Sequence, residues 1–258
     1  MQNVKLACHT ITFGENQKDD LDAVFAAIAA AGYSGLEIGI RHIQEIAPAE
    51  LRAMLDQHGL HMVATHIGGN LIDRDQADRE SKILDEILEI LKHTGSKYLM
   101  YSGLKDADAD LVAAEIDRIN RAAVQCLQHG VQLLYHNHNW EFFGDQSPNT
   151  WEALIANAAP EVKLCPDLGW LHKAGVDLVG FLQTYQDRIG VIHYKDFASL
   201  DQDLRDTVVL GDGIVPLEPA AKWIRENMPD VWVISEQDFA DIPPAEAILA
   251  NAAFFKGE

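Results

Sequence analysis

Short apolar segments of β-type composition alternate eight times with longer segments of helical period along this chain. The expected strands are residues 4–13, 35–40, 61–68, 97–103, 131–138, 162–167, 189–196 and 231–238. The expected helices lie between and after them, at 19–33, 48–59, 78–95, 108–130, 149–160, 177–188, 217–230 and 243–257. Such alternation is typical of βα units and a parallel sheet.

Eight such units predict a closed α/β barrel of the (β/α)8 type. The length of 258 residues suits one such barrel, and no linker or change of composition divides the chain, so we expect a single domain over residues 1–258. The alternative is an open, doubly wound sheet. It seldom needs eight units, and no G-x-G-x-x-G motif follows the first strand.

The net charge excludes some classes of partner. Forty acidic and 20 basic residues give a formal charge of −20, which repels phosphate backbones and anionic lipids. We therefore expect no nucleic acid and no membrane as partner. The three cysteines show no paired spacing, and no run of about 18 apolar residues or signal-like start occurs, so a cytoplasmic protein with reduced thiols is expected.

Ionisable side chains gather at the carboxyl ends of the expected strands, where barrels of this kind carry their chemistry. The residues concerned are His9, Glu37, His66, His136, His138, Asp167, His193, Lys195, Glu236 and Asp238. Residues two apart on a strand face the same side, so His136 with His138 and His193 with Lys195 should point together into the barrel mouth. One such residue alone is more often structural, and Asp167 could simply cap the next helix.

The coincidence of these residues on four consecutive strands predicts a divalent metal site. Buried charge is costly unless it is paired or bound to a metal. A set of imidazoles and carboxylates without thiolate suits Mn²⁺, Zn²⁺, Co²⁺ or Fe²⁺, and the sequence does not choose among them.

The motifs YHNHNWEF, CPDLGWLHKAG, VIHYKDF, GDGIVPLEP and VISEQD together resemble the xylose isomerase-like TIM barrels, the sugar phosphate isomerases/epimerases. The resemblance covers nearly the whole chain. It implies one catalytic divalent metal ion with the ligands His136, Asp167, His193 and Glu236. At strand five His138 is the other candidate for the ligand, and His136 is preferred.

The chain also departs from the pattern of the ketose epimerases in this family. Their strand-five ligand is a glutamate, where this chain has His136, so the mechanism with two metal-bound glutamates is in doubt. Their histidine three residues after the aspartate is replaced by Trp170, which could stack on a sugar ring, and His172 follows. Lys195 in HYKD is more similar to the inosose dehydratases.

The resulting prediction is a metal-dependent isomerase or epimerase acting next to a carbonyl of a small carbohydrate. A lyase, such as an inosose dehydratase or a 3-keto-glycoside eliminase, is the alternative, since one site can support each reaction. The expected catalytic residues are Glu236, Glu141, Lys195 and His138, and the expected substrate-binding residues are His9, Glu37, His66, Trp170 and His172. Lys195 would act as a base after losing its charge, or as a donor.

Two further classes of function are less favoured. An apurinic-site endonuclease would need a basic face, and a non-catalytic sugar-binding protein would not need the full ligand set. Barrels of this type often associate, so a homo-oligomer stays open.

Overall fold

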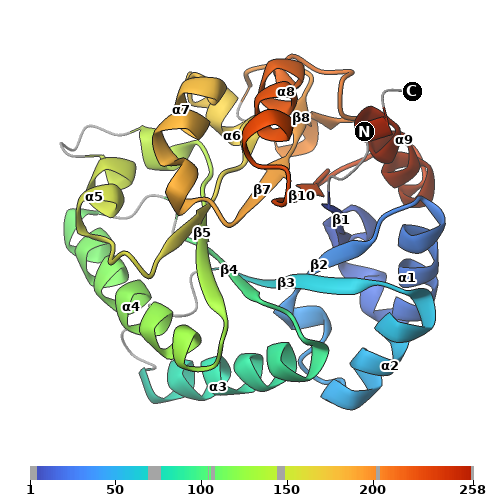
Figure 1. Ribbon diagram of the computed structural model, residues 1–258, viewed down its shortest axis with the longest axis horizontal. Helices are drawn as coiled ribbons and strands as arrows, with labels where there is room; N and C mark the ends of the chain where they lie inside the picture. The colour runs from blue at the N-terminus through green and yellow to red at the C-terminus, as the bar shows by residue number, and fades with distance from the viewer. Residues whose placement is uncertain are drawn as a thin grey trace.

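Eight parallel strands form one sheet that curves into a barrel in the computed structural model, which describes residues 5–68, 77–103, 105, 108–143, 149–201 and 204–256 (Figure 1). The strands are β1 (Lys5–His9), β2 (Gly35–Gly39), β3 (His61–Gly68), β4 (Tyr98–Ser102), β5 (Gln132–His136), β6 (Lys163–Cys165), β7 (Val191–Tyr194) and β10 (Trp232–Ser235). Their order in the sheet is β6-β5-β4-β3-β2-β1-β10-β7. The predicted barrel is thereby confirmed.

Helices surround the sheet on its outer side (Figure 1). They are α1 (Leu21–Ala30), α2 (Pro48–His58), α3 (Ala77–Thr94), α4 (Ala109–Gln128), α5 (Thr150–Asn157), α6 (Leu168–Lys173), α7 (Leu178–Tyr185), α8 (Leu217–Asn227) and α9 (Pro244–Lys256). Local sequence fixes several ends: Asn149 and Glu152 form a capping box before α5, and Gly59, with a φ of 66°, ends α2. None of the described helices is long and apolar enough to cross a bilayer.

The core has an inner and an outer layer. The inner layer fills the barrel with side chains from the strands, namely Ala7, Val63, Ala64, Met100, Leu134, Cys165, Val191 and Ile234. The outer layer packs the other strand faces against the helices. Because this apolar plug fills the barrel below the strand ends, the polar residues that follow it come together above it. All three cysteines are free and buried, as expected.

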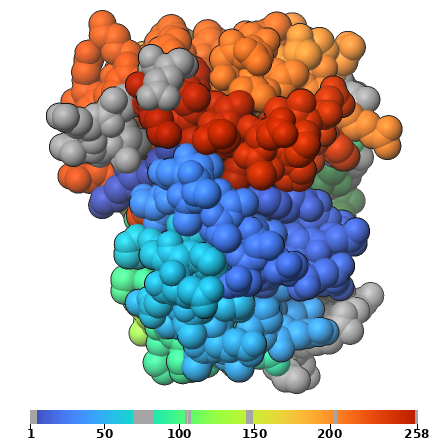
Figure 2. All heavy atoms as spheres, turned by 90° about the vertical axis from the view of Figure 1, so that its right-hand side faces the viewer, coloured from blue at the N-terminus to red at the C-terminus, as the bar shows by residue number. Residues whose placement is uncertain are grey.

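The barrel closes unevenly around its circumference. β1 and β10 pair along four residues, from Lys5 with Trp232 to Cys8 with Ser235. Figure 2 shows the same closure from outside, where the blue N-terminal part lies against the red C-terminal part. Between β6 and β7 the described residues form two isolated bridges, Leu164 with Ile189 and Asp167 with His193. Among the neighbouring strands in the described part of the barrel, this β6–β7 seam has the sparsest backbone pairing.

Three local features differ from the expectation. Residues 10–13 form a 3-10 turn rather than the end of the first strand, because the His9 ring accepts a hydrogen bond from the Ile11 amide and turns the chain. The short helix α6 and a two-stranded hairpin, β8 (Asp196–Phe197) with β9 (Thr207–Val208), were not expected. Both are too short to leave a periodic signal.

Candidate metal centre

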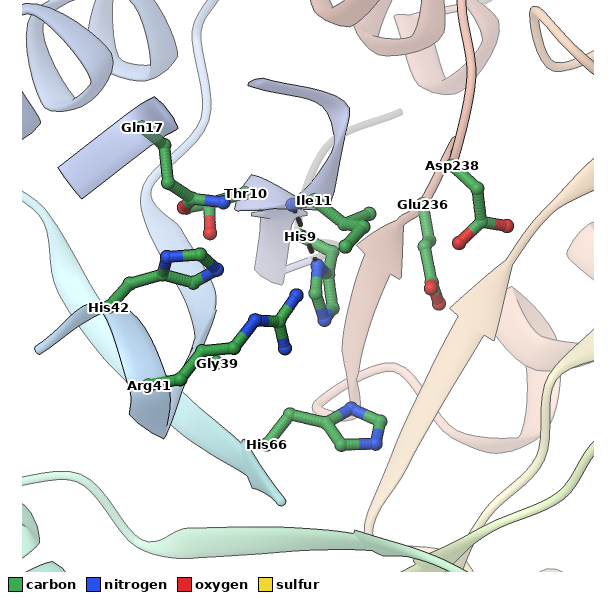
Figure 3. Close-up of a pocket in the computed structure, with 10 residues that line it drawn as sticks. All are labelled: His9, Thr10, Ile11, Gln17, Gly39, Arg41, His42, His66, Glu236 and Asp238. Carbon is green, nitrogen blue, oxygen red and sulfur yellow. Dashed lines mark hydrogen bonds between the residues drawn. The ribbon is translucent and has the colours of Figure 1, made fainter. Parts of the chain in front are cut away.

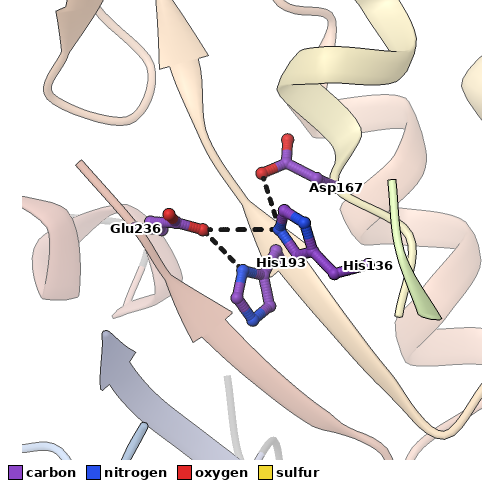
Figure 4. Close-up of side chains that lie close together, drawn as sticks. All are labelled: His136, Asp167, His193 and Glu236. Carbon is purple, nitrogen blue, oxygen red and sulfur yellow. Dashed lines mark hydrogen bonds and ion pairs between the residues drawn. The ribbon is translucent and has the colours of Figure 1, made fainter. Parts of the chain in front are cut away.

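Four buried side chains from four different strand ends meet above the barrel plug. His136, Asp167, His193 and Glu236 each offer one ligand atom, and these atoms all lie within 4.8 Å of one another (Figure 4). We call this set the four-residue centre. The structure brings together the set expected from the sequence and includes His136, rather than His138, from β5.

Two atoms of the four-residue centre test whether a metal ion would fit there. Nε2 of His136 and Oδ2 of Asp167 are buried and have no hydrogen-bond partner among the described residues. They lie 3.5 Å apart, and the same His136 nitrogen lies 3.6 Å from Oε2 of Glu236. Unpartnered buried polar atoms are unfavourable without a ligand, and these separations suit two ligands of one ion. The donor set therefore fits a divalent cation.

Asp167 also performs the structural role considered for it. Its Oδ1 accepts a hydrogen bond of 2.9 Å from the Trp170 amide and so caps α6. Because Oδ1 is used in this way, the side chain is held with Oδ2 facing the centre. The capping and ligand interpretations of Asp167 are thus compatible.

His193 lies between two carboxylates. Its Nδ1 is 2.6 Å from Oε2 of Glu236, and its Nε2 is 2.9 Å from Oε2 of Glu37. Burial alone would lower the pKa of His193, but Cys165, Glu37 and Glu236 raise that pKa well above its ordinary value. A metal ion bound here would replace the proton on one ring nitrogen.

Lys195 is a buried cation beside the four-residue centre. Its Nζ lies 2.8 Å from Asp238 Oδ2, 3.1 Å from Glu236 Oε1 and 3.7 Å from Asp167 Oδ2. Burial alone would lower the pKa of Lys195, but the three carboxylates raise it above its ordinary value. The carboxylates therefore favour the protonated lysine, and a neutral lysine base is the less favoured of the two roles expected from the sequence. The alternative, a positively charged donor, fits.

Glu37 binds three histidines on the other side of the centre. Its carboxylate oxygens lie 3.3 Å from His9 Nε2, 2.9 Å from His66 Nδ1 and 2.9 Å from His193 Nε2. Burial would raise the pKa of Glu37, but these imidazoles hold it well below its usual range. Burial lowers the pKa of His66 to about 4, despite Glu37, so its ring is neutral near pH 7.

The predicted catalytic residues His138 and Glu141 form a separate layer. The His138 ring stacks on Trp140 at 3.8 Å and lies 5.1 Å from the His136 ring. Glu141 is fully buried and accepts hydrogen bonds from the His138 amide and the Tyr135 hydroxyl. Burial raises its pKa to about 7. Its contacts support His138 rather than reach into open space.

Trp170 and His172 were expected to bind substrate. Trp170 is 2% exposed, and its ring packs against Phe197 with Lys195 above it at 5.3 Å. The ring face is therefore covered by neighbouring side chains. The expected stacking on a sugar is not supported, because α6 directs the ring toward Phe197 and Lys195. No described contact of the four-residue centre involves His172, which lies half-buried further along α6.

A cavity of about 130 Å³ adjoins the centre on the β1–β2 side (Figure 3). It is lined by His9, Thr10, Ile11, Gln17, Gly39, Arg41, His42, His66, Glu236 and Asp238. Glu236 belongs both to this cavity and to the four-residue centre, so a small molecule in the cavity would reach the ligand set. The predicted substrate-binding residues His9 and His66 line it, whereas Glu37 lies behind them.

Sequence reasoning missed several polar residues of this region, among them Thr10, Arg41 and His42 in the lining of the cavity. Ser102 ends β4 and lies between the rings of His66 and His136. Gln17 lines the cavity from a 3-10 turn. The position of Ser102 at a strand end could have identified it, but a serine there is too common to stand out, and Gln17 leaves no such signal.

A parallel eight-stranded barrel with an imidazole–carboxylate centre at its strand ends defines a class of protein, and the comparisons agree with it. The profile of the xylose isomerase-like TIM barrel family matches residues 25–257. The chain belongs to this family.

Individual relatives share less than a third of their residues with this chain. An inosose dehydratase from Geobacillus kaustophilus (strain HTA426) is 28% identical over 257 positions, covering 86% of this chain and 82% of that protein. A sugar phosphate isomerase/epimerase from Parabacteroides distasonis ATCC 8503 has a TM-score of 0.80 at 20% identity, covering 99% and 94% of the two chains. The IOLI protein, solved with a zinc atom, has a TM-score of 0.79 at 17% identity, covering 98% and 97%. These two structural likenesses show the fold alone.

Proposed function

We infer that this protein is a divalent-metal-dependent lyase that removes water from a small polyhydroxylated ketone. The observation that carries the proposal is the contact of 3.1 Å between Oε1 of Glu236 and Nζ of Lys195 at the edge of the four-residue centre. It places a carboxylate and a protonated amine side by side, which are the base and the acid that a β-elimination needs. The inosose dehydratase relatives support the same class of reaction.

The two oxygens of Glu236 have different surroundings. Oε2 faces the histidines of the centre, and Oε1 faces Lys195. Burial would raise the pKa of Glu236, but Lys195 and the histidines hold it well below its usual range, so the base form is present. A divalent ion in the centre would act as a Lewis acid on the substrate carbonyl and make the neighbouring C–H more acidic.

The elimination then balances within the Glu236–Lys195 pair. The Glu236 carboxylate takes the proton from the carbon next to the carbonyl, and the C–H electron pair forms the carbon–carbon double bond. The β-hydroxyl leaves with a proton from the Lys195 ammonium as water. The proton on Glu236 passes to the neutral Lys195 amine across the contact of 3.1 Å, which restores both groups.

An isomerase or epimerase is the second candidate. This reaction also begins with proton transfer next to a carbonyl, and the structural likeness to a sugar phosphate isomerase/epimerase is compatible with it. Return of the proton on the opposite face needs a second acid–base group there. The centre offers His136 rather than a carboxylate at β5, and Glu141 is turned toward Tyr135 and His138. The lyase therefore takes precedence.

The decisive experiment is to incubate the purified protein with unphosphorylated keto-cyclitols and 3-keto-sugars in D₂O. Mn²⁺, Co²⁺ and Zn²⁺ are supplied in turn, and the products are followed by ultraviolet absorbance and NMR. We expect an unsaturated ketone that forms only with metal. Solvent deuterium in an isomerised or inverted product would select the second candidate instead. Absence of any metal-dependent turnover would refute both.

Variants separate the roles within the pair. Glu236→Gln should abolish turnover while some metal binding is retained, because one oxygen remains to coordinate. Lys195→Met should cut turnover at least 100-fold with little change in metal affinity, as expected for loss of a general acid (about 10²–10⁴-fold). Lys163→Met is the matched control. Lys163 is the first residue of β6, at the end of the strand away from the four-residue centre, and its substitution should leave turnover unchanged. Full activity in Glu236→Gln would exclude the proposed role of that residue.

A further inference from the structure

The histidine contacts of Glu37 form a directed hydrogen-bond system around the four-residue centre. Glu37 is fully buried, and a carboxylate only accepts hydrogen bonds, so each imidazole nitrogen that faces it must carry a proton. His9 fits this rule independently. Its Nδ1 accepts the Ile11 amide at 2.9 Å, so a neutral His9 ring carries its proton on Nε2, the atom that faces Glu37.

The first branch of this system reaches His193 directly. Nε2 of His193 lies 2.9 Å from Oε2 of Glu37 and must donate to it. When the ring is neutral, its other nitrogen, Nδ1, is then the one with the free lone pair. That Nδ1 is also the atom that faces Glu236 in the four-residue centre. Glu37 thus selects the ring nitrogen of His193 that can bind a metal.

The second branch reaches His136 through two residues. His66 donates from Nδ1 to Glu37 at 2.9 Å, so its neutral ring can only accept at Nε2, where the Ser102 hydroxyl lies at 2.8 Å. Because the hydroxyl proton is used toward His66, the Ser102 oxygen accepts from His136 Nδ1 at 3.4 Å. The remaining nitrogen of His136, Nε2, is the unpartnered atom that faces Asp167 and Glu236.

We propose that Glu37 is the positioning residue that sets the tautomers of both histidine ligands, His193 directly and His136 through His66 and Ser102. Each branch ends with a lone pair directed at the four-residue centre. Hydrogen bonds of this kind hold a ligating ring in orientation and raise its basicity, and their loss commonly costs 10- to 100-fold in metal affinity. The inference rests on the metal dependence of the proposed function and adds a residue that need not touch metal or substrate.

A different use of the same residues is a second metal site. His9, Glu37 and His66 could themselves hold an ion, because their ligand atoms also lie within 4.8 Å of one another. The hydrogen-bond pattern argues against it. Each nitrogen facing Glu37 carries a proton in the directed system, and Glu37 is shared with His193, so an ion there would displace the bond that orients a ligand of the first centre.

The test uses the full chain labelled with ¹⁵N-histidine, loaded with one equivalent of Zn²⁺. Long-range ¹H–¹⁵N correlation spectra assign the protonated nitrogen of each ring, and competition with a chelator gives the Zn²⁺ affinity. In the unsubstituted protein we expect the proton on Nε2 of His193 and on Nδ1 of His136. The opposite tautomer at either ring would overturn the proposal.

Two variants address the two branches. Glu37→Gln should lower Zn²⁺ affinity 10- to 100-fold and disturb both rings, since an amide cannot accept from three imidazoles. Ser102→Ala removes only the hydroxyl that joins His66 to His136, so it should lower the affinity less, disturb the signals of these two rings and leave those of His193 unchanged. Glu115→Gln is the matched control. Glu115 is a buried carboxylate in α4 that accepts a hydrogen bond from the Tyr101 hydroxyl, and its substitution should leave affinity and tautomers unchanged.

The outcomes separate this inference from the proposed function. If the unsubstituted protein binds no divalent ion, the metal centre fails and the inference fails with it. If it binds one Zn²⁺ and Glu37→Gln or Ser102→Ala leaves affinity and tautomers unchanged, the inference alone is overturned. A second Zn²⁺ located by anomalous scattering at His9, Glu37 and His66 would also overturn it.

Discussion

Asp167 uses its two carboxylate oxygens for different purposes, and substitutions can separate them. Asn caps helices about as well as Asp, so Asp167→Asn should keep the bond to the Trp170 amide and present an amide nitrogen to the four-residue centre. We expect metal affinity to fall more than tenfold, because the ligand oxygen is lost. The metal-free stability, measured by urea unfolding, should stay within about 1 kcal/mol of the original.

Asp167→Ala is the comparison for this pair. It removes both oxygens, so the loss of metal affinity should be accompanied by a further cost of about 1 kcal/mol for the missing cap. Unchanged affinity in Asp167→Asn would show that Oδ2 is not a ligand.

Glu141 should make the stability of the protein depend on pH. In the folded protein its pKa is raised from 4.5 to about 7 by burial, so between these values the folded chain holds a proton that the unfolded chain has lost. Stability therefore decreases as pH rises through this window. At about 1.4 kcal/mol per pH unit, the full effect is about 3.5 kcal/mol.

Comparison with Glu141→Gln isolates this contribution from the titrating histidines. The free energy of unfolding of the metal-free protein and of the variant is measured by urea between pH 4.5 and 7.5. The advantage of the original residue over glutamine should shrink steadily as pH rises. A difference that does not vary with pH would mean that Glu141 titrates alike in both states.

Single residues could be placed from the sequence where strand periodicity decides their direction. His136, Asp167, His193, Lys195 and Glu236 were predicted to converge because they end parallel strands, and they do. Residues beyond a strand end have no such constraint. Glu141, Trp170 and His172 lie in the turns and the short helix that follow, where local turning rather than strand direction decides what each side chain faces.

At the level of elements, the β6–β7 seam and the four-residue centre coincide. Asp167 and His193 form one of the two bridges across the seam, and both belong to the four-residue centre. A bound ion would therefore join the two edges of the sheet through side chains where the backbone pairing is sparse. The sequence predicted every strand of the barrel, but it carries no signal for how well neighbouring strands pair.

Hydrogen exchange should detect this joining. The amides of Gly190 and His193 donate across the seam to Leu164 and Pro166, at 2.9 Å each. Without metal they should exchange faster than the amides between β3 and β4, which pair along five residues, because the seam opens locally. Saturating Zn²⁺ should bring the two groups to similar rates. Seam amides that are equally protected with and without metal would contradict the prediction.

At the level of the whole molecule, the charge of −20 should prevent binding to nucleic acids. Non-specific binding is driven by release of counterions from phosphates by clustered Lys and Arg, and here acids outnumber bases two to one. A gel-shift experiment with duplex DNA containing an apurinic site, near physiological salt, should show neither a complex nor incision. A shifted band or a nick would contradict this and reopen the endonuclease interpretation.

The seam also bears on where this chain could be cut and rejoined. In chain order the first and last strands of the barrel are β1 and β10, which pair along four residues, whereas the sparse pairing lies between β6 and β7. Consider a circular permutant in which the original ends are joined and the chain is opened at Gly175, between α6 and α7. Its new ends and the sparse strand pairing would then lie at the same junction. An ion bound at the four-residue centre would then be the main link between its first and last strands. A permutant opened at Gly59, beside β2 and β3, which pair along five residues, should close without it.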